Sequence, residues 1–432
     1  MTDQTKEVKQ RSEKRYLLII LLIAAVLRIA LAIYLGQAVE PISPAYDQIF
    51  FDDVARRLLE GKGFSYTRPP WPFIQPGEPT AFISYLYTSF IAGVYWVFGA
   101  NPLVLRVIQA LICSLMPWQV YQFVKKLGDI RPNWEENRTS ILALIAALIT
   151  AGYAYFVFFS ATLMTEGFYL MTVTWSILLT LDLRRRPTLK KWALWGLAVT
   201  LATLLRQVFM LIAVFLFLYV LWHNWRQVKV SHVLVAGVIA ASLILPWTVR
   251  NYLVFDRFLL LNSQGGQTFW NTNHPALGTN FEGSPMFPIP TDLEHLNEAE
   301  LDNALLRRGW QNVVADPGRF FLLSFDRFLE HFRFWSIPTS TPLNNIARLV
   351  SYTILLPFMV TGLVMSFKEW RRWLLLYLFI LAYTGIHIIS WPGPRYRLPV
   401  DVLLVIFAAL PLASILTHLF PKIFTNQLTT EQ

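Results

Sequence analysis

Long apolar runs are the feature that most restricts how this chain can fold. An apolar run of about 20 residues spans a bilayer when it forms a helix. Several such runs occur in the 432 residues, of which 55% are apolar. We therefore predict an all-α polytopic membrane protein with about ten membrane-spanning helices. The predicted spans lie near residues 16–36, 102–124, 139–158, 167–183, 192–205, 207–222, 233–247, 349–366, 374–390 and 400–419.

The basic residues indicate on which side of the membrane each loop lies. Cytoplasmic loops carry an excess of Lys and Arg, so lysine-rich segments are expected on one side. We interpret the net charge of +10 as a sign of topology and expect no nucleic-acid partner. The basic N-terminus precedes an apolar run without a small-residue cleavage site, which predicts a retained signal anchor. Ten of the eleven lysines fall in residues 1–15, 125–138, 184–191, 223–230, 367–373 and the C-terminal tail.

Residues 81–99 form a further apolar run, which is rich in Tyr and Ser. If this run crossed the membrane, every later span would reverse its direction. The basic segment 184–191 would then lie outside, which contradicts the positive-inside rule. We therefore predict that 81–99 is a helix embedded in the outer leaflet, and that both termini are cytoplasmic.

A candidate catalytic acid follows the first span. At helical period, Asp47 shares one face with Phe51, Val54, Ala55 and Leu58, which predicts an amphipathic helix along the membrane surface. A carboxylate on the apolar face is desolvated, as a general base needs to be. The alternative is an N-cap or a solvated turn acid. The neighbouring acids, Asp52 and Asp53, are expected on the wetter face.

Ten crossings place further charged residues on the same outer face as Asp47. Glu166 lies in a short turn between two spans, and Arg206 interrupts an apolar run. An arginine at a helix centre costs about 2.5–3.5 kcal/mol, so Arg206 is expected at a span end. Carboxylates and guanidiniums on one face suit an anionic ligand such as a phosphate, although each alone could be a loop acid or a snorkelling arginine. The other polar residues on this face are Arg250, Asn251, Arg395 and Arg397.

The chain divides into three predicted parts. Residues 1–248 form an N-terminal transmembrane module that contains the first outer loop, 37–101. Residues 249–345 form an extracytoplasmic segment, and residues 346–432 add the last transmembrane helices. The middle part contains the pair Gly265 and Gly266, which allows close backbone approach or a tight turn. It also contains two predicted helices, a polar-faced one at 293–314 and an aromatic amphipathic one at 318–335 that rests on the membrane.

No metal site is predicted from the residues alone. The single cysteine, Cys113, excludes a thiolate cluster, and the seven histidines show no metal-ligand spacing.

Several motifs resemble the GT-C glycosyltransferase superfamily when they are read together and in order. The segment from Asp47 to Phe64 is similar to the first outer loop of bacterial relatives of dolichyl-phosphate-mannose protein mannosyltransferases and of lipid A aminoarabinose transferases. Phe51 departs from the family, in which this position is often Tyr, and IQPGEPTAF lacks the usual Arg-Pro-Pro pattern. The later motifs are LMTEGFYLM around Glu166, LATLLRQ around Arg206, PWTVRNYLVFDRFLLLNSQGGQTFWNTN and RYRLP.

The resemblance implies a GT-C-like helical bundle in the plasma (inner) membrane, with outer-face amphipathic helices. Such an enzyme transfers a sugar from a polyprenyl-phosphate donor to a lipid, glycan or protein acceptor on the extracytoplasmic face, with inversion. Asp47 would be the catalytic base, and Glu166 could orient the acceptor or support a divalent cation. Candidates for binding the donor phosphate are Arg206, Arg250, Arg395 and Arg397. Candidates for binding the substrate are Asn251, Tyr396, Gly265 and Gly266.

Two other classes of membrane protein share some of these features. A transporter or a flippase of lipid-linked glycans should show charges within several spans and internal repeats, and no repeat is visible. An oligosaccharide polymerase or ligase would act on the same face and would differ in the size of its product. The sugar and the acceptor depend on the shape of the pocket, which loops 37–80 and 249–345 are expected to form.

Overall fold

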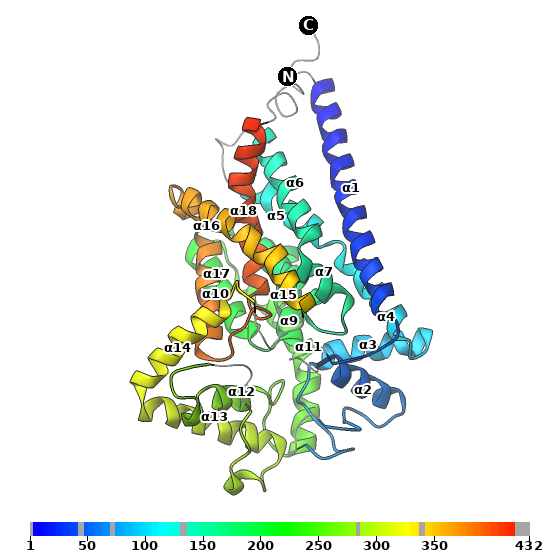
Figure 1. The fold of residues 1–432 in the computed structure, drawn as a ribbon, viewed down its shortest axis with the longest axis vertical. Coiled ribbons are helices and arrows are strands. Elements are labelled where there is room, and N and C mark those ends of the chain that lie inside the picture. Colours follow the sequence, from blue (N-terminus) through cyan, green and yellow to red (C-terminus); the bar gives the residue numbers. More distant parts are fainter. Residues whose placement is uncertain are drawn as a thin grey trace.

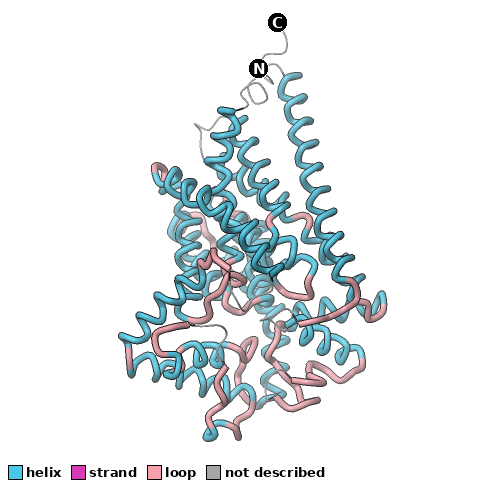
Figure 2. Tube along the Cα trace, in the orientation of Figure 1, coloured by secondary structure: helices cyan, strands magenta, loops and turns pink. Residues whose placement is uncertain are grey.

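A computed structural model of the chain describes residues 3–41, 47–69, 74–129, 136–281, 286–336 and 342–419. Over these ranges the fold is all-α, as predicted, and contains no β-strand beyond one isolated bridge between Ser65 and Pro79. The start of α1 and the end of α18 lie at the same end of the helical bundle (Figure 1). Loops gather towards the opposite end, around α2, α12 and α13 (Figures 1 and 2).

Each of the ten predicted spans is helical. The helices that contain them are α1 (Asp3–Leu35), α4 (Pro102–Cys113) with α5 (Met116–Asp129), α6 (Glu136–Gly152) with α7 (Ala154–Ala161), α8 (Glu166–Arg185), α9 (Leu189–Leu205), α10 (Phe209–Asn224), α11 (Val230–Phe255), the π-helix η3 (Leu349–Thr353) with α16 (Ile354–Phe367), α17 (Trp370–Ile389) and α18 (Leu398–Leu419).

Length and composition identify six of the described helices as able to cross a membrane, so the chain is a multi-pass membrane protein. A seventh candidate is the pair formed by α6 and α7, which is bent by 53° at Tyr153. The total of ten crossings stays a prediction, because α8, α9 and α10 are not among these candidates, and α9 and α10 are short, with 17 and 16 residues. The six helices are Gln10–Leu35, Pro102–Gly128, Val230–Phe255, Asn345–Phe367, Trp370–Ile389 and Leu398–Leu419.

The apolar run 81–99 forms α3 (Tyr85–Phe98), a helix of 14 residues. At 1.5 Å per residue it is about 21 Å long, which is shorter than the roughly 30 Å hydrocarbon core of a bilayer. It lies across the direction of α1 and packs beside α2 (Asp47–Leu59) (Figure 1). The length and direction of α3 therefore support its interpretation as a helix embedded in one leaflet.

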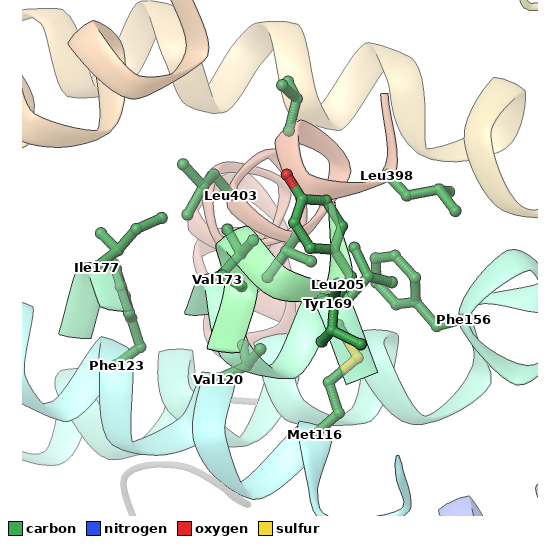
Figure 3. Packing of buried hydrophobic residues seen from close by; sticks show 14 of the residues in the cluster. Met116, Val120, Phe123, Phe156, Tyr169, Val173, Ile177, Leu205, Leu398 and Leu403 are labelled. Carbon is green, nitrogen blue, oxygen red and sulfur yellow. The ribbon is translucent and has the colours of Figure 1, made fainter. Parts of the chain in front are cut away.

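The centre of the bundle is α18, whose residues from Leu398 to Pro411 are buried. Figure 3 shows side chains of α5, α7, α8, α9 and α18 meeting in this core. Close packing against α16 requires a glycine, because a Cβ on Gly362 would lie 1.9 Å from the carbonyl oxygen of Phe407. Small residues at such crossings let membrane helices approach closely.

The long outer segment contains short helices that border the loop-rich end. The predicted helix at 293–314 is α13, which begins with a capping box between Asn297 and Glu300. The predicted amphipathic helix at 318–335 is α14, which buries Leu323 and leaves Phe321 and Phe325 exposed. The elements here are α12 (Gly265–Thr272), η1 (Pro275–Leu277), η2 (Thr291–Leu293), α13 (Glu298–Ala315), α14 (Pro317–His331) and α15 (Pro342–Arg348).

Candidate active site

Glu166 is the first residue of α8, and its side chain is only 2% exposed. Nη2 of Arg206 donates a hydrogen bond to its Oε1 atom at 2.6 Å, and Nε of Arg395 donates to the same oxygen. Burial raises the pKa of Glu166, but the two guanidiniums outweigh burial and hold this pKa below its usual range. Glu166 is therefore a charged carboxylate at neutral pH.

Arg206 lies where the apolar run 192–222 is interrupted. The helix α9 ends at Leu205 and α10 begins at Phe209, so Arg206 lies at a helix end; that this is a span end stays a prediction. The guanidinium lies over the rings of Tyr169 and Tyr396, with centroid distances of 5.5 and 5.2 Å. These contacts, together with Glu166, give Arg206 a fixed orientation.

Arg395 joins the two predicted catalytic carboxylates. It lies in the segment between α17 and α18, and its Nη2 atom donates to Oδ2 of Asp47 at 2.5 Å while its Nε atom donates to Glu166. Burial lowers the pKa of Arg395, but Asp47 and Glu166 raise it above its usual value, so the guanidinium stays charged. The candidate active site is therefore a cluster of alternating charges: Arg206, Glu166, Arg395 and Asp47.

Asp47 begins α2 and does not have the predicted desolvated environment. Its side chain is 40% exposed, whereas that of Asp52 is 14% exposed, so the prediction for these two acids is reversed. Asp47 is the first residue of α2, one turn before the buried Phe51, and helical period alone does not fix the exposure of a helix end. Asp52 faces α3, accepts a hydrogen bond from Tyr95 at 2.5 Å and pairs with Arg56 at 2.8 Å.

The remainder of the predicted apolar face of α2 is confirmed. Phe51, Val54 and Ala55 are buried, and Phe51 contacts the ring of Tyr87 edge to face at 4.9 Å. Asp53 accepts a hydrogen bond from the backbone N–H of Thr67 at 2.7 Å. The helix is therefore held by apolar packing, and Asp47 is presented at its end.

Arg397 lies outside this cluster although it is two residues from Arg395. Its Nε atom donates to Asp401 at 2.8 Å and its Nη1 atom donates to the carbonyl of His331 at 2.9 Å. The side chains of Arg397 and Asp401 are both 0% exposed. Tyr153 completes this buried group with a hydrogen bond to Asp401 at 2.8 Å. The structure thus gives Arg397 a role in joining α14 to α18.

Arg250 and Asn251 bind loop backbone. Arg250 donates to the carbonyl of Thr80 at 2.9 Å, and its guanidinium lies 4.7 Å from the ring of Trp247. Asn251 donates to the carbonyl of Leu261 at 2.8 Å. Both side chains therefore hold the first outer loop and the long outer segment against α11, apart from the cluster around Glu166.

The glycine pair provides close backbone approach, as predicted, but the partner is another helix. A Cβ on Gly266 would lie 1.7 Å from the carbonyl oxygen of Asp302 on α13. The backbone N–H of Gly266 donates to Oδ1 of Asp302 at 2.7 Å. Gly265 lies nearer the site, since a Cβ there would be 3.8 Å from Nε2 of Gln207, next to Arg206.

Glu298, which no sequence motif singled out, joins the two outer segments. Its carboxylate accepts hydrogen bonds from the hydroxyl of Thr80 and the N–H of Ala81, both at 2.8 Å, and from the hydroxyl of Ser263. Burial raises the pKa of Glu298. The sequence NEAE does predict a helix start here, but a capping motif carries no information about distant partners.

Within the described ranges, no group of three or more His, Cys, Asp or Glu side chains is arranged to hold a metal ion.

Tyr396 is the one predicted substrate-binding residue that lies directly against the charged cluster, since its ring contacts the guanidiniums of Arg206 and Arg395.

Part of the chain matches a protein-family model, and nearly all of it aligns with solved structures. A family model described as dolichyl-phosphate-mannose-protein mannosyltransferase matches residues 84–249, which include Glu166 and Arg206. No curated protein matches the chain. The archaeal oligosaccharyltransferase AglB from Archaeoglobus fulgidus, solved with an inhibitory peptide and a dolichol-phosphate, aligns with 98% of this chain at 15% identity and a TM-score of 0.60. Its apo form aligns with 96% of this chain and 52% of its own, at 13% identity and a TM-score of 0.57.

The alignment covers 53% of AglB in its peptide complex, so this chain spans about half the length of that protein. ArnT from Cupriavidus metallidurans, bound to undecaprenyl phosphate, aligns with 96% of this chain and 81% of its own at 13% identity, with a TM-score of 0.41. The alignment with AglB therefore shows a shared fold over nearly the whole of this chain, and the mannosyltransferase family model matches residues 84–249 within it.

Proposed function

We propose that this chain is a membrane glycosyltransferase that moves a sugar from a polyprenyl-phosphate carrier to an acceptor hydroxyl. The observation that carries the proposal is the position of Arg395, which contacts both Asp47 and Glu166. The arrangement brings an exposed carboxylate, a buried carboxylate and two guanidiniums together. A carboxylate can act as a general base and a guanidinium can stabilise a leaving phosphate, so these groups suit transfer from a lipid phosphate.

The guanidiniums match the chemistry of the leaving group. When the bond between the anomeric carbon and the phosphate oxygen breaks, both electrons stay on the phosphate, whose negative charge increases. A cation positioned there stabilises the transition state more than the ground state. Arg395 is the better placed of the two for this role, because it reaches Asp47 at the exposed edge of the cluster, while Arg206 is fixed between two tyrosine rings.

Asp47 is assigned the proton transfer. In the ligand-free cluster its Oδ2 atom is paired with Arg395. A donor phosphate that binds Arg395 competes with this ion pair and leaves the carboxylate available. The acceptor oxygen then forms a bond to the anomeric carbon, its proton moves to Asp47, and the polyprenyl phosphate leaves from the opposite face. Direct displacement of this kind inverts the anomeric configuration.

The positive-inside rule supports a location of this site on the extracytoplasmic face of the inner membrane. The basic residues before the first apolar run lie at the start of α1, and α2 lies at the opposite end of the bundle (Figure 1). The donor sugar would therefore be presented from the outer leaflet, to a lipid, glycan or protein acceptor.

The test is transfer of radiolabelled sugar from a panel of polyprenyl-phosphate sugars, with membranes that contain wild type, Asp47→Asn or Asp52→Asn. Asp52 is a matched control because it lies on the same helix and is also paired with an arginine. We expect transfer by wild type and the control, and a loss of at least about 100-fold in Asp47→Asn, which lacks the general base. Parallel reactions with EDTA show whether a divalent cation takes part.

Near-normal turnover in Asp47→Asn would remove Asp47 from the mechanism. If no donor yields a product with well-inserted wild type, the glycosyltransferase proposal fails, and translocation of lipid-linked glycans becomes the next activity to measure. Transfer of an oligosaccharide in place of a single sugar would assign the chain to the polymerase or ligase class.

A further inference from the structure

The guanidinium of Arg206 is part of a closed ring of contacts with three tyrosines and a histidine. This guanidinium lies over the rings of Tyr169 and Tyr396 at 5.5 and 5.2 Å. The hydroxyl of Tyr169 is 3.1 Å from that of Tyr383, whose ring is 4.8 Å from the ring of His387. His387 in turn stacks on Tyr396, with the ring centroids 5.5 Å apart and the planes at 29°. The imidazole of His387 thus closes the ring between Tyr383 and Tyr396.

His387 also contacts both ends of the segment that carries Arg395. Its Nδ1 atom is 3.1 Å from the carbonyl oxygen of Trp391, just after α17, and its ring stacks on Tyr396, the residue after Arg395. Between these contacts lie Pro392, Gly393 and Pro394, and the φ of Gly393 is +144°. The segment has no helix of its own to orient Arg395, so side chains from neighbouring elements must do so.

His387 has a rigid support on its other face. The ring of His331 on α14 stacks against it at 5.8 Å with the planes at 14°, and the exposed fractions of the two residues are 0% and 5%. Arg327, one turn earlier on α14, donates to the carbonyls of Ile388 and Ile389, both at 3.4 Å. The imidazole of His387 is therefore held between α14 and the Arg395 segment.

We propose that His387 is a positioning residue for the transfer reaction. It holds Tyr396 against Arg206, and it fixes the segment that places Arg395 between Asp47 and Glu166. The effect on catalysis is indirect, because His387 acts through Tyr396 and Arg395. The expected effect on the transfer rate rests on the proposed function, whereas the packing of His387 against Tyr396 does not.

The experiment compares His387→Ala with His387→Phe and His232→Ala. Phenylalanine keeps the stacked ring and loses the contact between Nδ1 and Trp391. His232 is a matched control at a distant site: it is 7% exposed, its ring stacks on Trp192 at 6.0 Å, and its Nδ1 atom accepts from the backbone of Lys229 at 3.2 Å. Each alanine substitution therefore removes a buried, stacked imidazole and one hydrogen bond to the backbone.

A small displacement of a catalytic group can reduce a rate about 100-fold. We expect His387→Ala to lower kcat about 10- to 100-fold with less than about a threefold change in KM, because the loss falls on the transition state. His387→Phe should recover most of the rate, and His232→Ala should keep its kcat after correction for the folded fraction. Equal losses of kcat in the two alanine variants would overturn the proposal.

A second measurement is independent of activity. His387→Ala, Tyr396→Leu and the double variant are compared by thermal unfolding in detergent. Residues in direct contact show non-additive effects, so the double variant should lower Tm by less than the sum of the single shifts. Additive shifts would contradict the packing role. If wild type transfers no sugar, the proposed function fails while the unfolding cycle still decides whether His387 supports Tyr396.

Discussion

Glu298 offers a direct test of how the two outer segments hold each other. The Glu298→Ala substitution removes the acceptor for the hydroxyl of Thr80, the N–H of Ala81 and the hydroxyl of Ser263. These three residues are 1%, 1% and 3% exposed, so their donors would be left without a partner in a buried place. Leaving a buried donor unpaired costs about 1–3 kcal/mol.

At the lower end of that range, three unpaired donors cost about 3 kcal/mol in total. Because Glu298 lies at the junction of the loops, this loss should appear as local opening. An energy of 3 kcal/mol corresponds to roughly a 150-fold larger open population. We therefore expect amide hydrogen exchange in residues 64–69 and 74–84 to accelerate by about 100-fold in Glu298→Ala, measured by mass spectrometry on the detergent-solubilised protein.

Two further variants make the result specific. Glu298→Gln should behave nearly as wild type, because an amide oxygen can still accept from Ala81 and Ser263 and a hydroxyl can rotate to accept from the amide. Arg308→Ala is the control, since Arg308 lies on the same helix and pairs with Asp292 at the surface. Unchanged exchange in Glu298→Ala, or equal acceleration in Arg308→Ala, would refute the reasoning.

Three further predictions follow from single contacts. Arg395→Lys should lower kcat/KM about 100-fold in the sugar-transfer assay, because one amine cannot reach both Glu166 and Asp47. A loss below about threefold would contradict this expectation, and Arg257→Lys at the surface is the control. Gly362→Ala should destabilise the protein by about 1–3 kcal/mol in thermal unfolding, since its Cβ would lie 1.9 Å from Phe407, whereas Gly385→Ala, with nothing within 4 Å, should not. Burial raises the pKa of Asp302 to about 6 from 3.8, so the folded state binds this proton more tightly and loses about 3 kcal/mol of stability as pH rises from about 4 to 6. Asp302→Asn has no carboxyl group to titrate, so the Tm of this variant minus the Tm of wild type should increase from about pH 4 to about pH 6. A constant difference would contradict the raised pKa of Asp302.

Helix positions could be predicted from the sequence because hydropathy and periodicity are properties of one segment at a time. The break between α9 and α10 at Arg206 follows from the energy of a buried charge, which needs no knowledge of partners. The same holds for α13 and α14, which begin within a few residues of the predicted helices. The resemblance to the GT-C superfamily also came from local motifs in a fixed order.

The partners of the charged side chains could not be predicted in this way. Arg395 and Arg397 are equivalent in the motif RYRLP, yet one contacts Asp47 and Glu166 while the other is buried against Asp401. Their directions depend on how the segment between α17 and α18 packs against α14 and α8, which is a property of the whole bundle.

The exposure of Asp47, the candidate base, also depends on the tertiary structure. Helical period correctly placed Phe51, Val54 and Ala55 on the buried face of α2, and Asp47 shares that face in projection. Projection does not show what covers the end of a helix, and Asp47, the first residue of α2, has 40% of its side chain exposed. The sequence by itself therefore determined which segments are helices. Only the tertiary structure decided which charges meet, because ion pairs and burial depend on atoms that are distant along the chain.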